Sequence, residues 1–390
     1  MARLLIAAAL AIASAGPAFA QSEPYKVFET RPVITQGPYL VATSETATMV
    51  VWMTDTPSHS EVRFAKGAGL AATALSTVVE NQKDGLVPVG TRHAILLTGL
   101  EPGATYSYQA VSTRVVKLKA YWPDKGLSIE SPVRAFTTFD ARKPTASFSA
   151  VTDTHEDVTR IRALNKMIDW PSTDFLLHLG DAFHWLDNED QLFRLWLEPT
   201  IAGLAGVKPL IYARGNHELR GPFARELFDY IPTPENRFYY ARDDGPVHLM
   251  VLDTGEDKPD DTNVYARLNR TGPYRDAELA WLREHVRTAP RVASAPFRVV
   301  AMHQPRWGWL ADGPDAWIAL ANDAKVDLVI AGHNHKLSYT PPGPTVAHKY
   351  HLLVLGQDQV ARVDATTTEL KITVTGTDGK IVQAIAIPRR

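Results

Sequence analysis

The sequence has 390 residues, 45% of them hydrophobic, which is enough chain for two domains with substantial cores. Its 41 basic and 43 acidic residues nearly balance, so no basic field for binding nucleic acid is expected. It contains no cysteine, which excludes disulfides and thiolate ligands and leaves any metal ion to His, Asp, Glu, Asn or backbone oxygen.

The first twenty residues, MARLLIAAALAIASAGPAFA, have the pattern of a secretory signal peptide. Arg3 supplies a short basic start, residues 4–12 are apolar, and Ala18 and Ala20 provide the small-x-small form of a cleavage site. The apolar run is too short to cross a bilayer, and no later stretch is long enough. We therefore expect cleavage before Gln21 and a periplasmic or secreted mature protein without a transmembrane segment.

Residues 21–142 predict an all-β domain. Short runs rich in β-branched and aromatic residues are separated by turn formers such as LEPGAT. Several such strands within about 110 residues favour a β-sandwich. The predicted strands cover residues 47–54, 60–66, 92–100, 105–112 and 133–139, and residues 140–145 have the composition of a linker.

Residues 143–390 predict a layered α/β domain, because apolar strands now alternate with helical patterns and further strands follow at the C-terminal end. Helices are expected at residues 158–168, around residues 192–196, and at residues 276–287 with Asp276 as the N-cap. Strands are expected at residues 146–153, 173–181, 208–218, 247–254, 297–305, 326–335, 351–357, 369–377 and 380–387.

Metal-binding residue types stand at the ends of five of these strands. Because strands of an α/β sheet present their carboxyl ends at one rim, we expect these side chains to converge. Histidine and carboxylate ligands suit Zn, Fe or Mn, whereas Mg and Ca prefer oxygen alone. Scattered polar residues beside turn glycines are the alternative, which five of the thirteen histidines at such positions disfavour. The residues are Asp153 and His155, Asp181, Asn216 and His217, His303, and His333 and His335.

Such a set can hold two metal ions about 3.5–4 Å apart, which clamp the attacking and leaving oxygens of a phosphoryl displacement. Two ions need a bridging carboxylate, and Asp181 is the natural candidate. Gly180, Gly215 and Gly332 stand beside the ligands, where glycine allows sharp turns and close approach of the backbone.

Five motifs in this order, D-x-H, G-D, G-N-H-E, a histidine after an apolar strand, and G-H-x-H, resemble the motif set of the calcineurin-like metallophosphoesterases. The preceding segment is similar to the N-terminal domain of purple acid phosphatases, a fibronectin type III-like sandwich. That similarity is carried by GPYL (37–40), MVVWMT (49–54) and LTGLEPGATYSYQA (97–110). The resemblance implies a metallophosphoesterase β-sandwich flanked by helices and preceded by an all-β sandwich.

The resemblance also implies roles for the residues. It implies two divalent transition-metal ions (Fe, Zn or Mn) and attack by a metal-activated water. His217 would contact the phosphate and protonate the leaving oxygen, which suits a side chain that titrates near neutrality. One ion would be held by Asp153, His155, Asp181 and His335, and the other by Asp181, Asn216, His303 and His333.

Two positions depart from the purple acid phosphatases. Those enzymes have a tyrosine three residues after the bridging aspartate, where this sequence has His184, and they lack a histidine at the place of His155. We therefore expect a colourless, non-purple first metal site. His184 and Arg306 are candidate substrate contacts; the alternatives are a rim residue and a solvent-exposed loop arginine. Supporting roles are expected for His178, Glu218 and Asp253.

These observations predict an exported hydrolase of small-molecule phosphate monoesters that does not bind nucleic acid. The monoester is favoured because the N-terminal domain resembles that of the purple acid phosphatases. A phosphodiesterase or nucleotide hydrolase on the same site is the enzymatic alternative. A non-catalytic surface-binding protein is the alternative of another class, and it is disfavoured because every expected metal position is filled.

Overall fold

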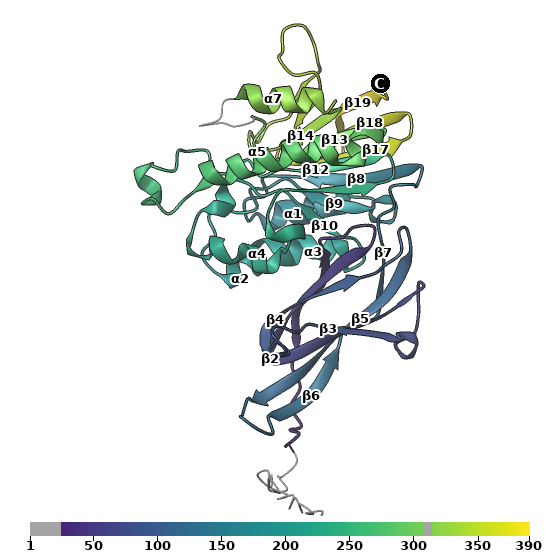
Figure 1. Cartoon of the computed structure of the whole chain (residues 1–390), viewed down its shortest axis with the longest axis vertical. Coiled ribbons are helices and arrows are strands. Elements are labelled where there is room, and N and C mark those ends of the chain that lie inside the picture. Colours follow the sequence, from purple (N-terminus) through teal and green to yellow (C-terminus); the bar gives the residue numbers. More distant parts are fainter. Residues whose placement is uncertain (1–24, 307–313) are drawn as a thin grey trace, which may run out of the picture.

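The computed structural model describes residues 25–306 and 314–390. The expected signal peptide and its cleavage site lie outside the described residues. The described chain forms an N-terminal all-β unit and a larger α/β unit (Figure 1). Within the described ranges, no helix has the length and apolar character needed to span a membrane.

Strand β2 (Ala47–Lys66) organises the N-terminal unit. Its first part pairs with β1 and β4, and its second part pairs with β3 and β5. Two separate strands were predicted here, but the polar residues around Pro57 form an irregularity in the pairing with β4 and not a turn. The other strands are β1 (Ile34–Val41), β3 (Thr77–Glu80), β4 (Gly90–Thr98), β5 (Thr105–Lys117), β6 (Asp124–Glu130) and β7 (Arg134–Thr137).

Apolar side chains from both parts of β2 meet in one core, in which Trp52 and Val62 are fully buried. The ring N–H of Trp52 donates to Ser112 Oγ on β5 at 2.8 Å, so the polar edge of this large side chain is satisfied inside the core. The unit therefore has a core of its own. Its fibronectin type III-like character and its end at residue 142 stay predictions.

Two six-stranded sheets form the centre of the α/β unit, and their apolar side chains meet in one core between them. Alternate residues of each buried strand face this core and the outer layer; in β14, Ile330 faces inward and Val329 outward. One sheet has the order β10 (Leu210–Tyr212), β9 (Phe175–His178), β8 (Thr145–Val151), β17 (Gln359–Thr366), β18 (Glu369–Gly376), β19 (Ile381–Pro388). The other has the order β11 (Tyr240–Asp244), β12 (Val247–Val251), β13 (Phe297–Ala301), β14 (Leu328–Ala331), β16 (His351–Val354), β15 (Ser338–Thr340).

Helices cover the outer faces of both sheets (Figure 1). On one side Trp196 packs in a cluster with Leu176 of β9, and on the other Leu282 and Trp317 pack in a cluster with Val329 of β14. This helix–sheet–sheet–helix arrangement confirms the predicted layered α/β fold. The helices are α1 (Val158–Met167), α2 (Glu189–Leu192), α3 (Glu198–Leu204), α4 (Leu227–Tyr230), α5 (Thr271–Thr288), α6 (Pro290–Ser294) and α7 (Pro314–Asp323).

The helix predicted at residues 276–287 begins five residues earlier than expected, and Asp276 is not its cap. Helix α5 starts at Thr271, and the carboxylate of Asp260 accepts the backbone N–H groups of Thr271 at 2.8 Å and Gly272 at 3.0 Å. The residue that satisfies these free N–H groups lies eleven positions upstream. A local capping pattern could not reveal it.

Strand β17 was not predicted, although it lies in the middle of its sheet between β8 and β18. Its sequence, QVARVDAT, places Arg362 and Asp364 among apolar residues, and these two side chains form an ion pair at 2.9 Å. Val363, between them, is fully buried in the core. The two charged side chains interrupt the apolar pattern of this segment, so the sequence alone did not predict a strand here.

The N-terminal unit packs on the helical layer that covers β8 to β10. Tyr39 Oη donates to the backbone oxygen of Tyr230 at 2.5 Å, and Tyr108 Oη donates to that of Gly206 at 2.6 Å. Tyr39 and Val51 also belong to the same apolar cluster as helices α1 to α4. The two units therefore share a buried interface.

Candidate metal centre

The loops after the parallel strands β8 and β9 carry three predicted ligands, Asp153, His155 and Asp181. The pairing of these strands places their carboxyl ends at the same edge. Backbone hydrogen bonds then join the loops: the N–H of Asp153 donates to Gly180 O at 3.0 Å, and that of His155 donates to Asp181 O at 3.1 Å. The strand order therefore brings the three side chains together.

The loop after β14 in the second sheet reaches the same place through Gly332. A Cβ at Gly332 would lie 1.9 Å from Thr152 Oγ1 and 2.7 Å from Asp153 Oδ2, so the two loops are in direct contact. The next residue, His333, donates its backbone N–H to Asp153 Oδ2 at 2.9 Å. Only glycine permits this close approach, and it joins the edges of the two sheets into one rim.

The first group of ligand atoms belongs to Asp153, His155, Asp181 and His335, and these atoms lie within 4.8 Å of one another. His335 Nε2 is 3.0 Å from His155 Nε2 and 3.2 Å from Asp153 Oδ1. His155 Nε2 is 4.0 Å from Asp181 Oδ2. The structure thus brings together the four residues predicted for the first metal, a donor set that suits Zn, Fe or Mn.

The second group consists of Asp181, His303 and His333, with Asn216 beside it. Asp181 Oδ2 lies 3.0 Å from His303 Nε2. His333 Nδ1 lies 3.3 Å from His303 Nε2 and 3.1 Å from Asn216 Oδ1. The two histidines of the G-H-x-H motif therefore face different groups, and Asp181 belongs to both.

Backbone carbonyls orient two of the imidazoles. His155 Nδ1 donates to Phe183 O at 3.0 Å, and His303 Nδ1 donates to Leu179 O at 2.6 Å. A proton held on Nδ1 leaves Nε2 as the atom that binds a metal. Both Nε2 atoms point into the groups described above, so the hydrogen bonds that the Nδ1 atoms donate orient these rings for metal binding.

The electrostatics of the centre suit a cation. Burial lowers the pKa of His155 to about 4, so its Nε2 is unprotonated at neutral pH. Burial alone would raise the pKa of Asp181, but the charge and hydrogen bond of His303 outweigh it and lower the pKa. Burial would lower the pKa of His303, yet Asp181 raises it to about 10. A buried position that favours positive charge beside an ionised carboxylate fits a divalent metal ion.

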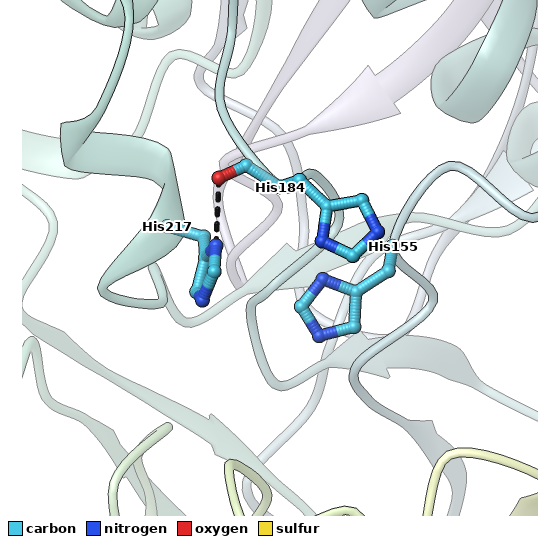
Figure 2. Close-up of side chains that lie close together, drawn as sticks. All are labelled: His155, His184 and His217. Atoms are coloured by element: carbon cyan, nitrogen blue, oxygen red, sulfur yellow. Dashed lines mark hydrogen bonds between the residues drawn. The ribbon is translucent and has the colours of Figure 1, made fainter.

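His217 and His184 lie beside His155 of the first group (Figure 2), and one ring nitrogen from each of these three histidines lies within 4.8 Å of the other two. His217 Nδ1 donates to the backbone oxygen of His184 at 2.7 Å, and the ring of His184 stacks on His155 with the ring centres 4.6 Å apart. The backbone N–H of His217 donates to Asp181 Oδ1 at 3.1 Å. His217, the predicted general acid, is therefore hydrogen-bonded through its backbone to the carboxylate that both groups share, and it adjoins the metal centre.

Glu218 supports the turn that carries Asp181. It is fully buried, and its carboxylate accepts the backbone N–H groups of Asp181 at 3.1 Å, Gly215 at 2.9 Å and Ala182 at 2.5 Å. These bonds connect the loop after β9 to the loop after β10. Glu218 thus orients its neighbours, as the sequence predicted.

His178 and Asp253 are also buried supports. His178 Nε2 accepts the ring N–H of Trp196 at 3.2 Å, and Asp253 forms an ion pair with Arg214 at 2.7 Å. Arg306, three residues after His303, is exposed, and its contact with substrate stays a prediction.

Sequence reasoning missed Arg220 and the buried Glu256 that holds it. The guanidinium of Arg220 lies 3.0 Å from His217 Nε2 and pairs with both oxygens of Glu256, at 2.6 and 2.9 Å. Arg220 lies three residues after His217, so its place in GNHELR was a usable signal. Glu256 gave none, because it reaches the site from a distant loop.

The model of the calcineurin-like phosphoesterase family matches residues 147–337, a segment that includes all seven predicted ligands and His217. The chain therefore contains a calcineurin-like metallophosphoesterase domain. No curated protein matches the sequence.

Among the solved structures that this chain resembles, two match more than nine tenths of its length. Purple acid phosphatase PPD1 from yellow lupin (Lupinus luteus) seeds has a TM-score of 0.64 at 14% identity, over 92% of this chain and 74% of that chain. PhoD has a TM-score of 0.58 at 12% identity, over 91% of this chain and 94% of that chain. At such identities the likeness is one of fold, and its extent includes both units.

Proposed function

We propose that the protein is an exported hydrolase of small-molecule phosphate monoesters that uses two divalent transition-metal ions. The observation that carries the proposal is the sharing of Asp181 by two groups of His and Asp side chains. A shared carboxylate is what a two-metal site needs to hold its ions about 3.5–4 Å apart. Bound ions of this kind activate a water and neutralise charge on the phosphoryl oxygens.

In this proposal each group holds one ion of Fe, Zn or Mn. Asn216 joins the second group through its side-chain oxygen, which lies 3.1 Å from His333 Nδ1. The ligands are Asp153, His155, Asp181 and His335 for the first ion, and Asp181, Asn216, His303 and His333 for the second.

His217 contacts the phosphate and supplies the proton that the leaving oxygen takes. Its ring is held by the hydrogen bond from Nδ1 to His184 O, and its Nε2 lies 3.8 Å from Asp181 Oδ2, on the side of the centre. Arg220 adds a fixed positive charge beside Nε2 for a phosphoryl oxygen. His184 and Arg306 are proposed as further substrate contacts.

The preference for monoesters is supported by the resemblance of the N-terminal segment to that of purple acid phosphatases and by the fold of the lupin enzyme. Export to the periplasm or beyond is supported by the composition of residues 1–20.

The test is hydrolysis of p-nitrophenyl phosphate and bis-p-nitrophenyl phosphate by protein loaded with Zn, Mn or Fe, together with metal analysis. We expect about two ions per chain and faster hydrolysis of the monoester. Asp181→Ala should lose both ions and the activity, whereas Asp378→Ala, on the exposed turn before β19, should change neither.

Each result separates the alternatives. Faster hydrolysis of the bis ester would replace the monoesterase with a phosphodiesterase. A folded protein that binds no transition metal and cleaves neither ester would leave only the alternative of a non-catalytic surface-binding protein.

A further inference from the structure

We propose that a groove running from His217 away from the metal centre receives the leaving group of the substrate. We infer that it selects an ester whose leaving group is flat and apolar next to the phosphate and negatively charged at its far end. This inference rests on the proposed function and names the class of ester that the site accepts.

The near part of the groove is a cavity of about 690 Å³ that begins at His217. Three large apolar side chains line it while staying more than half exposed: Trp185 at 54%, Val264 at 70% and Leu268 at 69%. The ring N–H of Trp185 donates to Asp187 at 2.8 Å, which holds the indole at the rim. Exposed apolar side chains gathered around a cavity mark a binding site. This part of the groove suits an aromatic ring.

A second cavity of about 390 Å³ continues the groove. The two cavities share Leu219, Arg225, Leu268 and Asn269, so they are contiguous. Among the described residues that line the second cavity there is no predicted metal ligand. The second cavity therefore extends the groove beyond the first ring of a bound leaving group.

Two of the four arginines that line the second cavity have no ion-pair partner within the described chain, whereas Arg214 and Arg237 pair with Asp253 and Glu235. None of the described residues that line either cavity is Asp or Glu. Near the centre, Arg220 and Lys258 are paired with Asp257. Further along, Arg225 and Arg270 are exposed and form no ion pair with any described residue. The charge that remains available is at the far end.

Asn269 provides an independent sign that an acceptor is missing. Its side-chain nitrogen is buried and has no hydrogen-bond partner in the described structure. Asn269 and Arg225 both belong to the wall that the two cavities share. Buried donors are normally satisfied, so an unsatisfied one in a cavity wall points to a ligand acceptor. A carboxylate or a second phosphate would satisfy both the amide and the arginines.

The test compares aryl phosphates that differ in the charge of the far substituent. 4-Carboxyphenyl phosphate is compared with 4-carbamoylphenyl phosphate, whose far substituent is neutral. Further pairs of esters carry one or two methylene units between the ring and the far group, which places the charge further from the phosphate. The readout is the ratio of kcat/KM for the charged and neutral esters, measured on the metal-loaded full chain. Because each ratio is taken within one protein, partial misfolding cancels.

We expect the wild-type chain to prefer a carboxylate ester about five- to tenfold at low salt, and less at high salt. Arg225→Gln should bring that ratio close to one. The matched control is Arg283→Gln, which removes the same charge from an exposed position on α5 that lines neither cavity and should keep the ratio.

Two failures can be told apart. Hydrolysis with no preference at any spacer length, or a preference that Arg225→Gln leaves intact, overturns this inference and leaves the proposed function standing. No hydrolysis of any ester by metal-loaded protein overturns the proposed function, and this inference falls with it.

Discussion

Five of the seven predicted ligands have a positive φ: 50° at Asp153, 43° at His155, 51° at Asp181, 74° at His333 and 57° at His335. A residue other than glycine in this region costs on the order of 1–3 kcal/mol when the surroundings enforce it. Such strain gathers where side chains must point in a required direction. The loops are therefore shaped for ligand geometry at the expense of backbone stability.

Glu218 is the residue whose replacement should loosen these loops. In Glu218→Gln an amide N–H₂ replaces one carboxylate oxygen and faces backbone N–H groups that need an acceptor. We expect a loss of about 1–3 kcal/mol in the free energy of unfolding and a 10- to 100-fold weaker metal affinity. Urea unfolding and metal titration measure both; unchanged metal affinity would contradict the supporting role. Glu226→Gln, at an exposed position, is the control.

His217 should affect turnover and not metal content. His217→Asn should lower kcat by about 10²–10⁴-fold, because the leaving oxygen loses its proton donor. The loss should grow as the leaving alcohol becomes more basic, which a series of substituted phenyl phosphates measures. Metal content stays unchanged, since His217 lies outside both groups that share Asp181. Loss of an ion from this variant would make His217 a ligand.

At the scale of elements, the site depends on contact between the edges of two sheets. The loops after β8 and β9 come from one sheet, and the loops after β13 and β14 come from the other. Parallel neighbours align their carboxyl ends within each sheet, but only packing of the sheets places Gly332 against Thr152.

Gly332→Ala tests this contact. Its Cβ would meet Thr152 Oγ1 at 1.9 Å, so the loop after β14 must move and carry His333 with it. We expect a destabilisation of about 1–3 kcal/mol and a weaker second metal, read by thermal unfolding and metal titration. Gly343→Ala is the matched control, since nothing lies within 4 Å of its added Cβ. Equal behaviour of the two variants would show that the loop tolerates the shift.

At the scale of the whole molecule, buried neutral histidines link stability to pH. Burial lowers the pKa of His93 in the N-terminal unit to about 4 and that of His178 under the centre to about 3. An unfolded histidine titrates near 6.5, so between these values the unfolded chain binds more protons than the folded chain. The stability that these two histidines contribute is therefore complete above about pH 6.5 and falls as the pH drops toward 4.

His93→Gln should flatten this dependence. Glutamine does not titrate, and its amide can replace the contact between His93 Nε2 and Thr54 Oγ1, which is 2.9 Å long. Urea unfolding of chelated protein at pH 7 and pH 5 should show about 1–3 kcal/mol less loss for the variant than for the wild type. The difference between the two proteins removes the contribution of other titrating groups. Equal losses would show that His93 is not held neutral.

The ligand set, its order along the chain and the layered fold could be predicted from the sequence. The ligands follow apolar strands within a few residues, and strand pairing aligns such positions, so local patterns carried this information. The bridging role of Asp181 was predicted from the need of two ions for a shared carboxylate and from the family resemblance, and it stays a prediction.

Only the tertiary structure decided the contacts that come from distant segments. Asp260 caps α5 from eleven residues away, Glu256 orients Arg220 from another loop, and Arg225 and Asn269 both line the two cavities. None of these follows from local sequence, because the free energy of each contact depends on a partner that folding brings near. The surroundings that select a substrate are therefore a property of the folded chain.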